Sequence, residues 1–185
     1  MSRYVAELQT MLDPLSHRAK IAFSLWCAEH LVNLARGVLT DLGEMDKISG
    51  VIEFLKCREA DGKEADAESF RQLSGRLESI DFSKCDAIFS CNFGYDVVAI
   101  QATASLFFSL QVWQDNSAEC AARAAEAVLN AYDRVLSERI GSNSNSVEVL
   151  NLKEMHMEVK KQIEAVAQLQ SGFVPSSVLP ARALL

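Results

Sequence analysis

Apolar residues recur along most of this chain at intervals of three and four, the spacing that places side chains on one face of an α-helix. Strand-like alternation of apolar and polar residues does not extend over any useful length of the sequence. The spacing therefore predicts helices over about residues 2–12, 15–42, 45–57, 66–80, 96–113 and 117–140, and a last helix that begins near residue 145.

These segments predict an all-α fold, a single-domain bundle of about six or seven helices that spans residues 1–170. The sequence contains only 3 Pro and 8 Gly, which favours long uninterrupted helices. Residues 171–185 contain two prolines and a single charge, so we expect an irregular C-terminal tail there.

The helix expected over residues 15–42 carries two adjacent apolar stripes, which is typical of a helix buried on most sides. Residues 97–113 contain no charge, but they include glutamine, serine and threonine and are shorter than the about 20 residues of a membrane span. We therefore expect a central buried helix there. The core residues that we expect, each on the apolar stripe of its helix, are Phe23, Leu31, Phe107, Val128 and Ile163.

The composition is that of a globular protein, because 49% of the 185 residues are hydrophobic and 23% are charged. The net charge is −7 and no basic stripe is present, so neither nucleic acid nor an anionic membrane is an expected partner. The five cysteines are odd in number and form no CxxC pair, which argues against a disulfide framework and a zinc site. The N-terminus lacks a signal-peptide pattern, so we expect a cytoplasmic protein.

Catalytic and metal-binding motifs are missing from the sequence. The three histidines, His17, His30 and His156, lie outside any HExxH or ExxH pattern, and no phosphate loop or GxSxG motif occurs. We expect His17 to be solvated, and Cys27 and His30 to pack in the core. We therefore predict no catalytic residue, no cofactor and no metal. The alternative is an enzyme or small-molecule binder with an inter-helix pocket near Cys27 and His30.

Residues 82–95 contain four aromatic residues and two cysteines, Cys85 and Cys91, without a clear period. Two interpretations of this loop stay open: a hydrophobic plug over one end of the bundle, or a groove for a peptide or protein. The cysteines are read as buried thiols, with a reversible disulfide as the alternative.

Acidic residues concentrate in the window 41–68. Nine acidic and four basic residues leave this window with a charge of −5, most of the −7 of the whole chain. Such a patch would steer a basic protein partner toward it, whereas the alternative is a solvated face that keeps the protein soluble. The residues that we assign to partner binding are Asp41, Glu44, Asp46, Glu59, Asp61, Glu64, Asp66 and Glu68.

The run from residue 15 to residue 55 resembles the opening of the YjaG-like family of bacterial proteins of unknown function. Cys27, Ala28 and Glu29 match a Cys/Glu-containing stretch of that family, and residues 95–110 resemble its apolar central helix. The resemblance covers about residues 12–170 and implies an all-helical bundle without a known activity. Phe54 and Leu55 depart from the pattern, since the family tends to carry tryptophan there, and the proline-containing tail is also different.

These observations lead to one functional hypothesis. We expect a non-enzymatic protein-interaction domain, because the acidic window is the main unexplained feature and no catalytic motif is present. In its most specific form, the hypothesis is an immunity or antitoxin-type protein that binds and neutralises a basic toxin through its acidic surface.

Overall fold

A computed structural model describes residues 3–63, 65–84, 95–140 and 153–179 of the chain. Helices make up 86% of it, and no strand occurs in these ranges. This confirms the predicted all-α bundle. The helices are α1 (Arg3–Leu12), α2 (His17–Asp41), α3 (Met45–Asp61), α4 (Ala67–Glu78), α6 (Tyr95–Asp115), α7 (Ala118–Ile140) and α9 (Lys153–Ser171), with short 3-10 helices η1 (Phe82–Lys84) and η2 (Ser176–Val178).

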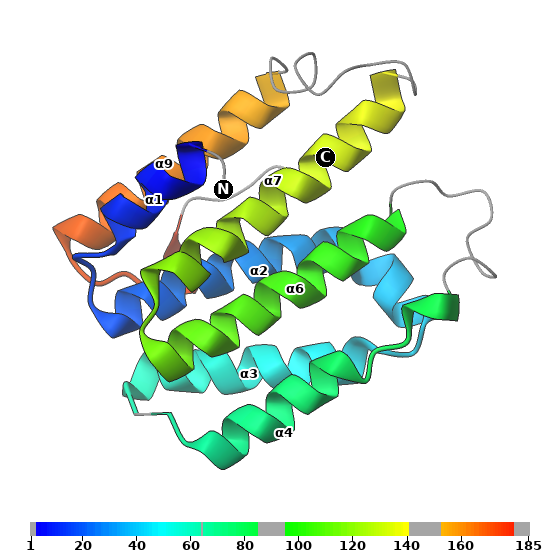
Figure 1. The fold of residues 1–185 in the computed structure, drawn as a ribbon, viewed down its shortest axis with the longest axis horizontal. Helices are drawn as coiled ribbons and strands as arrows, with labels where there is room; N and C mark the ends of the chain where they lie inside the picture. Colours follow the sequence, from blue (N-terminus) through cyan, green and yellow to red (C-terminus); the bar gives the residue numbers. More distant parts are fainter. Residues whose placement is uncertain (1–2, 64, 85–94, 141–152, 180–185) are drawn as a thin grey trace.

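Helix α2 lies at the centre of the bundle, and the other helices are arranged around it (Figure 1). It packs most extensively against α6, and it also contacts α7, α3, α9 and η2. Every residue from 19 to 28 is buried, as the two apolar stripes predicted. The outer layers are α1 and α9, which pack against α7 on one side, and α4, which packs against α6 and α3 on the other.

Local signals explain where the central helices begin and end. Ser16 caps α2 by accepting a hydrogen bond from the Ala19 amide, as serine commonly does at helix N-termini. Gly43 has a φ of 75° and follows the end of α2, where a glycine in the left-handed region commonly ends a helix. Helix α3 extends four residues beyond the predicted end at Cys57, because residues 58–61 continue the helix and Gly62, with a φ of 64°, ends it.

Helix α6 occupies the central position predicted for the uncharged segment. It packs against α2, α7, α4 and α3. Among the described residues, it is the one helix long and apolar enough to suit a membrane span, over Asp96–Asp115, and half of that stretch is buried inside the bundle. The apolar side chains of α6 thus pack against its neighbours within the bundle.

Three of the five expected core residues are buried: Phe23, Leu31 and Val128. Phe107 is only partly buried; its ring packs against Phe70 of α4, with 6.5 Å between the ring centroids. The expectation for Ile163 is wrong, since this side chain is 41% exposed on α9.

Buried polar residues explain why α9 buries a different face from the one that the apolar spacing predicts. Glu158 and Gln162 occupy core positions on α9, next to the apolar side that the spacing selected. The Gln162 amide donates to Glu158 Oε1 at 2.7 Å, and its oxygen accepts a hydrogen bond of 2.7 Å from the Tyr4 hydroxyl. Because buried polar groups are stable when they are hydrogen-bonded, α9 turns this polar pair inward and leaves Ile163 outside.

The burial of these residues predicts a contrast between two aliphatic side chains of similar size. We expect Leu31→Ala to lower the free energy of unfolding by about 2–5 kcal/mol, because Leu31 is fully buried. Ile163→Ala should cost less than about 1 kcal/mol, since a substitution on an exposed surface removes few contacts. Urea denaturation followed by far-UV circular dichroism measures both values. Equal losses would show that α9 packs in another orientation.

Candidate functional site

The acidic window does not form one patch, because α3 separates its two halves. Asp41, Glu44 and Asp46 lie near the beginning of α3, whereas Asp61, Asp66 and Glu68 lie at or beyond its end. A helix of 17 residues with a rise of about 1.5 Å per residue places the two groups about 25 Å apart. Glu64 lies outside the described residues.

At the beginning of α3, the acidic residues differ in exposure. The expectation of a surface role is wrong for Glu44, which is buried and forms an ion pair with Lys47, 2.7 Å between Glu44 Oε2 and Lys47 Nζ. Its backbone carbonyl also accepts hydrogen bonds from the first turn of α3. Asp41 and Asp46 are exposed and form no ion pair with any described residue, so they remain available to a partner.

At the other end, Asp61 and Asp66 are exposed but are held in place by local hydrogen bonds. Asp61 accepts a hydrogen bond from the Lys63 amide at 2.9 Å, and Asp66 caps α4 by accepting one from the Ser69 amide at 2.7 Å. These backbone hydrogen bonds lower the pKa of both carboxyl groups from the usual value of 3.8, and Arg58 lowers it further. Both residues are therefore firmly ionised at neutral pH.

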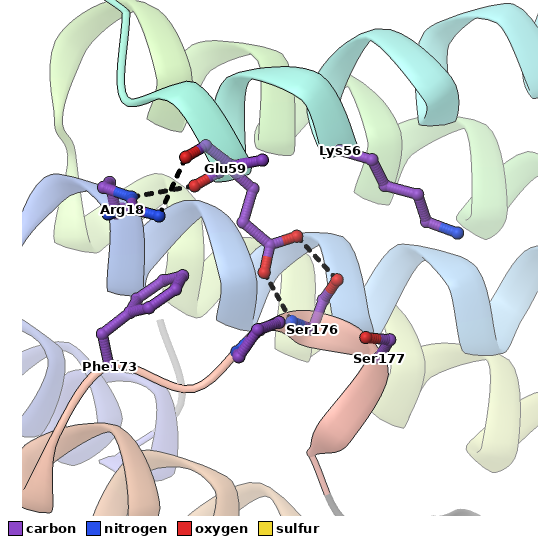
Figure 2. A pocket seen from close by; sticks show the side chains of 8 residues that line it. Arg18, Lys56, Glu59, Phe173, Ser176 and Ser177 are labelled. Atoms are coloured by element: carbon purple, nitrogen blue, oxygen red, sulfur yellow. Dashed lines mark hydrogen bonds between the residues drawn. The ribbon is translucent and has the colours of Figure 1, made fainter.

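Glu59 has a structural role, so its assignment to a partner-binding surface is wrong. Its side chain is only 5% exposed, and both carboxylate oxygens bind the tail (Figure 2). The Ser176 amide donates to Oε1 at 2.5 Å, and the Ser176 hydroxyl donates to Oε2 at 2.8 Å. Glu59 thereby attaches the C-terminal segment to α3, and Leu179 is buried just beyond the attachment.

Arg18 completes this attachment from α2. It donates hydrogen bonds to the Glu59 carbonyl at 2.9 Å and to the Ala60 carbonyl at 3.0 Å, both in the last turn of α3. Its guanidinium carbon lies 4.3 Å from the centre of the Phe173 ring, a cation–π contact. One side chain therefore joins α2, the end of α3 and the tail (Figure 2).

A pocket of about 380 Å³ lies where these three segments meet, and we call it the tail pocket. It is lined by Arg18, Lys56, Glu59, Ala60, Phe173, Pro175, Ser176 and Ser177. The sequence pattern does not predict this site, because it indicates only an irregular tail over residues 171–185. A signal was present in the Phe–x–Pro–Ser run at the start of that tail, but nothing in the sequence linked it to Glu59.

Near Arg18, two more side chains in the first turns of α2, His17 and Lys20, bind carbonyl groups at the end of α6. His17 Nε2 donates to the Val112 carbonyl at 2.9 Å, and Lys20 Nζ donates to the Asn116 carbonyl at 3.3 Å. The expectation of a solvated His17 is therefore wrong. The last carbonyls of a helix lack intrahelical partners and attract positive charge, which explains why these donors gather there.

The Cys27 and His30 pair is part of the core. Cys27 is fully buried, and His30 is buried with its Nε2 atom 3.1 Å from the Tyr132 hydroxyl oxygen. This confirms the expected core packing of the pair. In the described part of the chain, no group of three or more metal-ligating side chains is assembled.

Within the aromatic segment, the structure describes the short helix η1, in which Phe82 is partly buried against the core. Residues 85–94, with Cys85 and Cys91, lie outside the described residues, so both interpretations of this loop stay predictions.

No family model matches the chain, and no curated protein or solved structure is significantly similar to it. The resemblance to the YjaG-like family therefore stays a prediction.

The buried contact between Glu59 and Ser176 predicts a measurable contribution to stability. Ser176→Ala should lower the free energy of unfolding by about 1.5–3 kcal/mol, the usual range for a hydrogen bond to a charged group. Ser177→Ala is the matched control, because Ser177 is exposed, and its effect should stay within about 0.5 kcal/mol. Urea denaturation measures both. If the two variants lose the same stability, the tail is not anchored through Ser176.

The lowered pKa of Asp66 predicts a pH dependence. A carboxyl group whose pKa is lower in the folded state stabilises that state above the unfolded pKa, near 3.8, and the stabilisation is lost as pH falls through the folded pKa. Asp66→Asn should therefore keep its stability at pH 7, since asparagine also caps helices, but should lose less of it on acidification than the natural chain. Thermal melts at pH 7 and pH 3 test this, and identical acid sensitivity would contradict it.

Proposed function

We propose that this chain is a non-enzymatic domain that binds a basic protein partner through exposed carboxylates around the end of α3. The observation that carries the proposal is the contrast between two sets of residues. Asp61, Asp66 and Glu68 are exposed, whereas Cys27 and His30, the pair that would suggest catalysis, are in the core.

The surface around the end of α3 suits a charged interface because its carboxylates are pre-positioned. Asp61 and Asp66 are oriented by hydrogen bonds to the Lys63 and Ser69 amides, so little side-chain freedom would be lost on binding. Their lowered pKa values keep both charged over the physiological range. Glu68 pairs with Arg71 at 2.5 Å, but this pair is exposed, so a competing cation displaces it at little cost.

In its most specific form, the proposal is an immunity or antitoxin-type protein that neutralises a basic toxin. A small acidic chain of net charge −7 is well matched to such a partner, since complementary charge accelerates association and orients the encounter. This narrower form rests on charge, size and analogy rather than on a match to a known protein.

The test removes charge without removing a helix cap. After capture of a partner from native lysate at low salt, the double variant Glu64→Gln/Glu68→Gln is compared with Glu154→Gln/Glu164→Gln. The control changes the net charge equally at two exposed positions on α9, a helix that packs against α7, α1 and α2. Asp61 and Asp66 are left intact because they support the turn and the cap of α4.

We expect the test variant to associate several-fold more slowly than the control in about 50 mM salt, and this difference to shrink in about 500 mM salt as the charges are screened. Surface plasmon resonance with the captured partner measures the rates. Equal association rates for the two variants, at both salt concentrations, would show that the acidic end of α3 is ordinary solvated surface.

A further inference from the structure

The charge of the tail pocket differs in sign from the charge of the chain. Arg18 and Lys56 contribute two positive charges to its lining, and Glu59 contributes one negative charge, so the lining is at +1 in a chain of net charge −7. The Glu59 carboxylate is already engaged by the tail, since both of its oxygens accept hydrogen bonds from Ser176 and the residue is only 5% exposed. A ligand in the pocket would therefore meet mainly the two cations.

Both cations retain capacity to bind a ligand. A guanidinium has five N–H donors, and Arg18 uses two of its nitrogens, Nε and Nη2, for hydrogen bonds to described residues. Lys56 pairs with Glu29, 2.5 Å between Nζ and Oε1, but the Lys56 side chain is about half exposed, and an ammonium has three donors. An exposed ion pair contributes little, so an incoming anion can share the Lys56 ammonium with Glu29.

The pocket also offers an apolar surface. The Phe173 ring is 40% exposed even though Arg18 covers one of its faces, and Pro175 and Ala60 add further apolar lining. In the view of Figure 2, Arg18 and Phe173 lie on one side of Ser176, while Lys56 and Ser177 lie on the other. An apolar wall beside hydrogen-bond donors and positive charge is typical of a site that orients a small amphipathic molecule.

We propose that the tail pocket binds a small organic anion, with its carboxylate or phosphate group facing Lys56 and its apolar body against Phe173 and Pro175. This site uses residues other than the exposed carboxylates of the proposed protein interface, so either proposal can fail without the other. The segment that carries Phe173, Pro175 and Ser177 is seated by the Glu59–Ser176 hydrogen bonds, and the site is therefore formed only while the tail is attached.

The experiment is an NMR titration of the 15N-labelled full chain with phenyl phosphate as the probe. Inorganic phosphate supplies the charge alone, and benzyl alcohol supplies an apolar ring without the charge. We expect phenyl phosphate to bind with a dissociation constant of about 1 mM, as suits a ligand of this size, and to shift the amide signals of Ser176 and Ser177. The two partial probes should bind at least about fivefold more weakly, because each makes only part of the contacts.

Two variants separate the contributions of charge and ring. Lys56→Met should weaken phenyl phosphate binding about five- to tenfold, whereas Lys63→Met is the matched control and should not change it, since Lys63 does not line the pocket. Phe173→Leu should weaken phenyl phosphate binding but leave the weak binding of inorganic phosphate unchanged.

Three results would overturn the proposal: shifts located away from the tail pocket, equal binding by Lys56→Met and Lys63→Met, or binding of inorganic phosphate as tight as that of phenyl phosphate. The shift map of the natural chain tests the location even where a variant is unstable, so the proposal does not depend on the folding of any one substitution.

Discussion

The structure depends on the burial of α2 around most of its circumference. A helix whose residues from 19 to 28 are all inside cannot be covered by one neighbour, so α3, α6 and α7 surround it and α9 and η2 add further contacts. Its buried polar groups then need partners, because an unpaired polar group inside a protein is costly. Ser24 donates to the Ile21 carbonyl of its own helix, and His30 meets the Tyr132 hydroxyl of α7.

The same constraint brings several helix ends together at the first turns of α2. His17 and Lys20 bind carbonyls at the end of α6, while Arg18 binds carbonyls at the end of α3. Gly62 suits this junction for two reasons. Its φ of 64° favours glycine, and a β-carbon there would lie 3.2 Å from the Arg18 side chain. The positive residues that begin α2 thus serve as C-terminal caps for its neighbours.

The sequence predicted the fold class and the central helices well, because α2 and α7 are apolar on the face that the bundle buries and regular spacing is a strong signal. The prediction from the sequence was wrong where polar side chains are buried in the bundle. Gln162 and Glu158 replace the expected Ile163 face of α9. Tyr4 and the Ala125 carbonyl supply Gln162 with hydrogen-bond partners from other helices, and Gln162 in turn donates to Glu158. Such long-range pairing leaves no trace in the local spacing, so a one-dimensional pattern could not find it.

The prediction that the acidic residues of window 41–68 form one binding surface was wrong for a related reason. A count of charges along the chain treats Glu59 and Asp61 alike, although they are two residues apart and have opposite environments. Successive residues of a helix are rotated by about 100°, so Glu59 and Asp61, two residues apart, point in nearly opposite directions. The last turn of α3 therefore directs Glu59 inward to the tail and leaves Asp61 in water. Knowledge of the neighbours of that turn was needed to distinguish the two roles.

The last turn of α3 therefore belongs to both candidate sites. Glu59 and Ala60 line the tail pocket, and Asp61 begins the exposed acidic turn, while Arg18 binds the backbone of the first two. The two sites differ in charge and in chemistry, but they share the piece of backbone on which both are built.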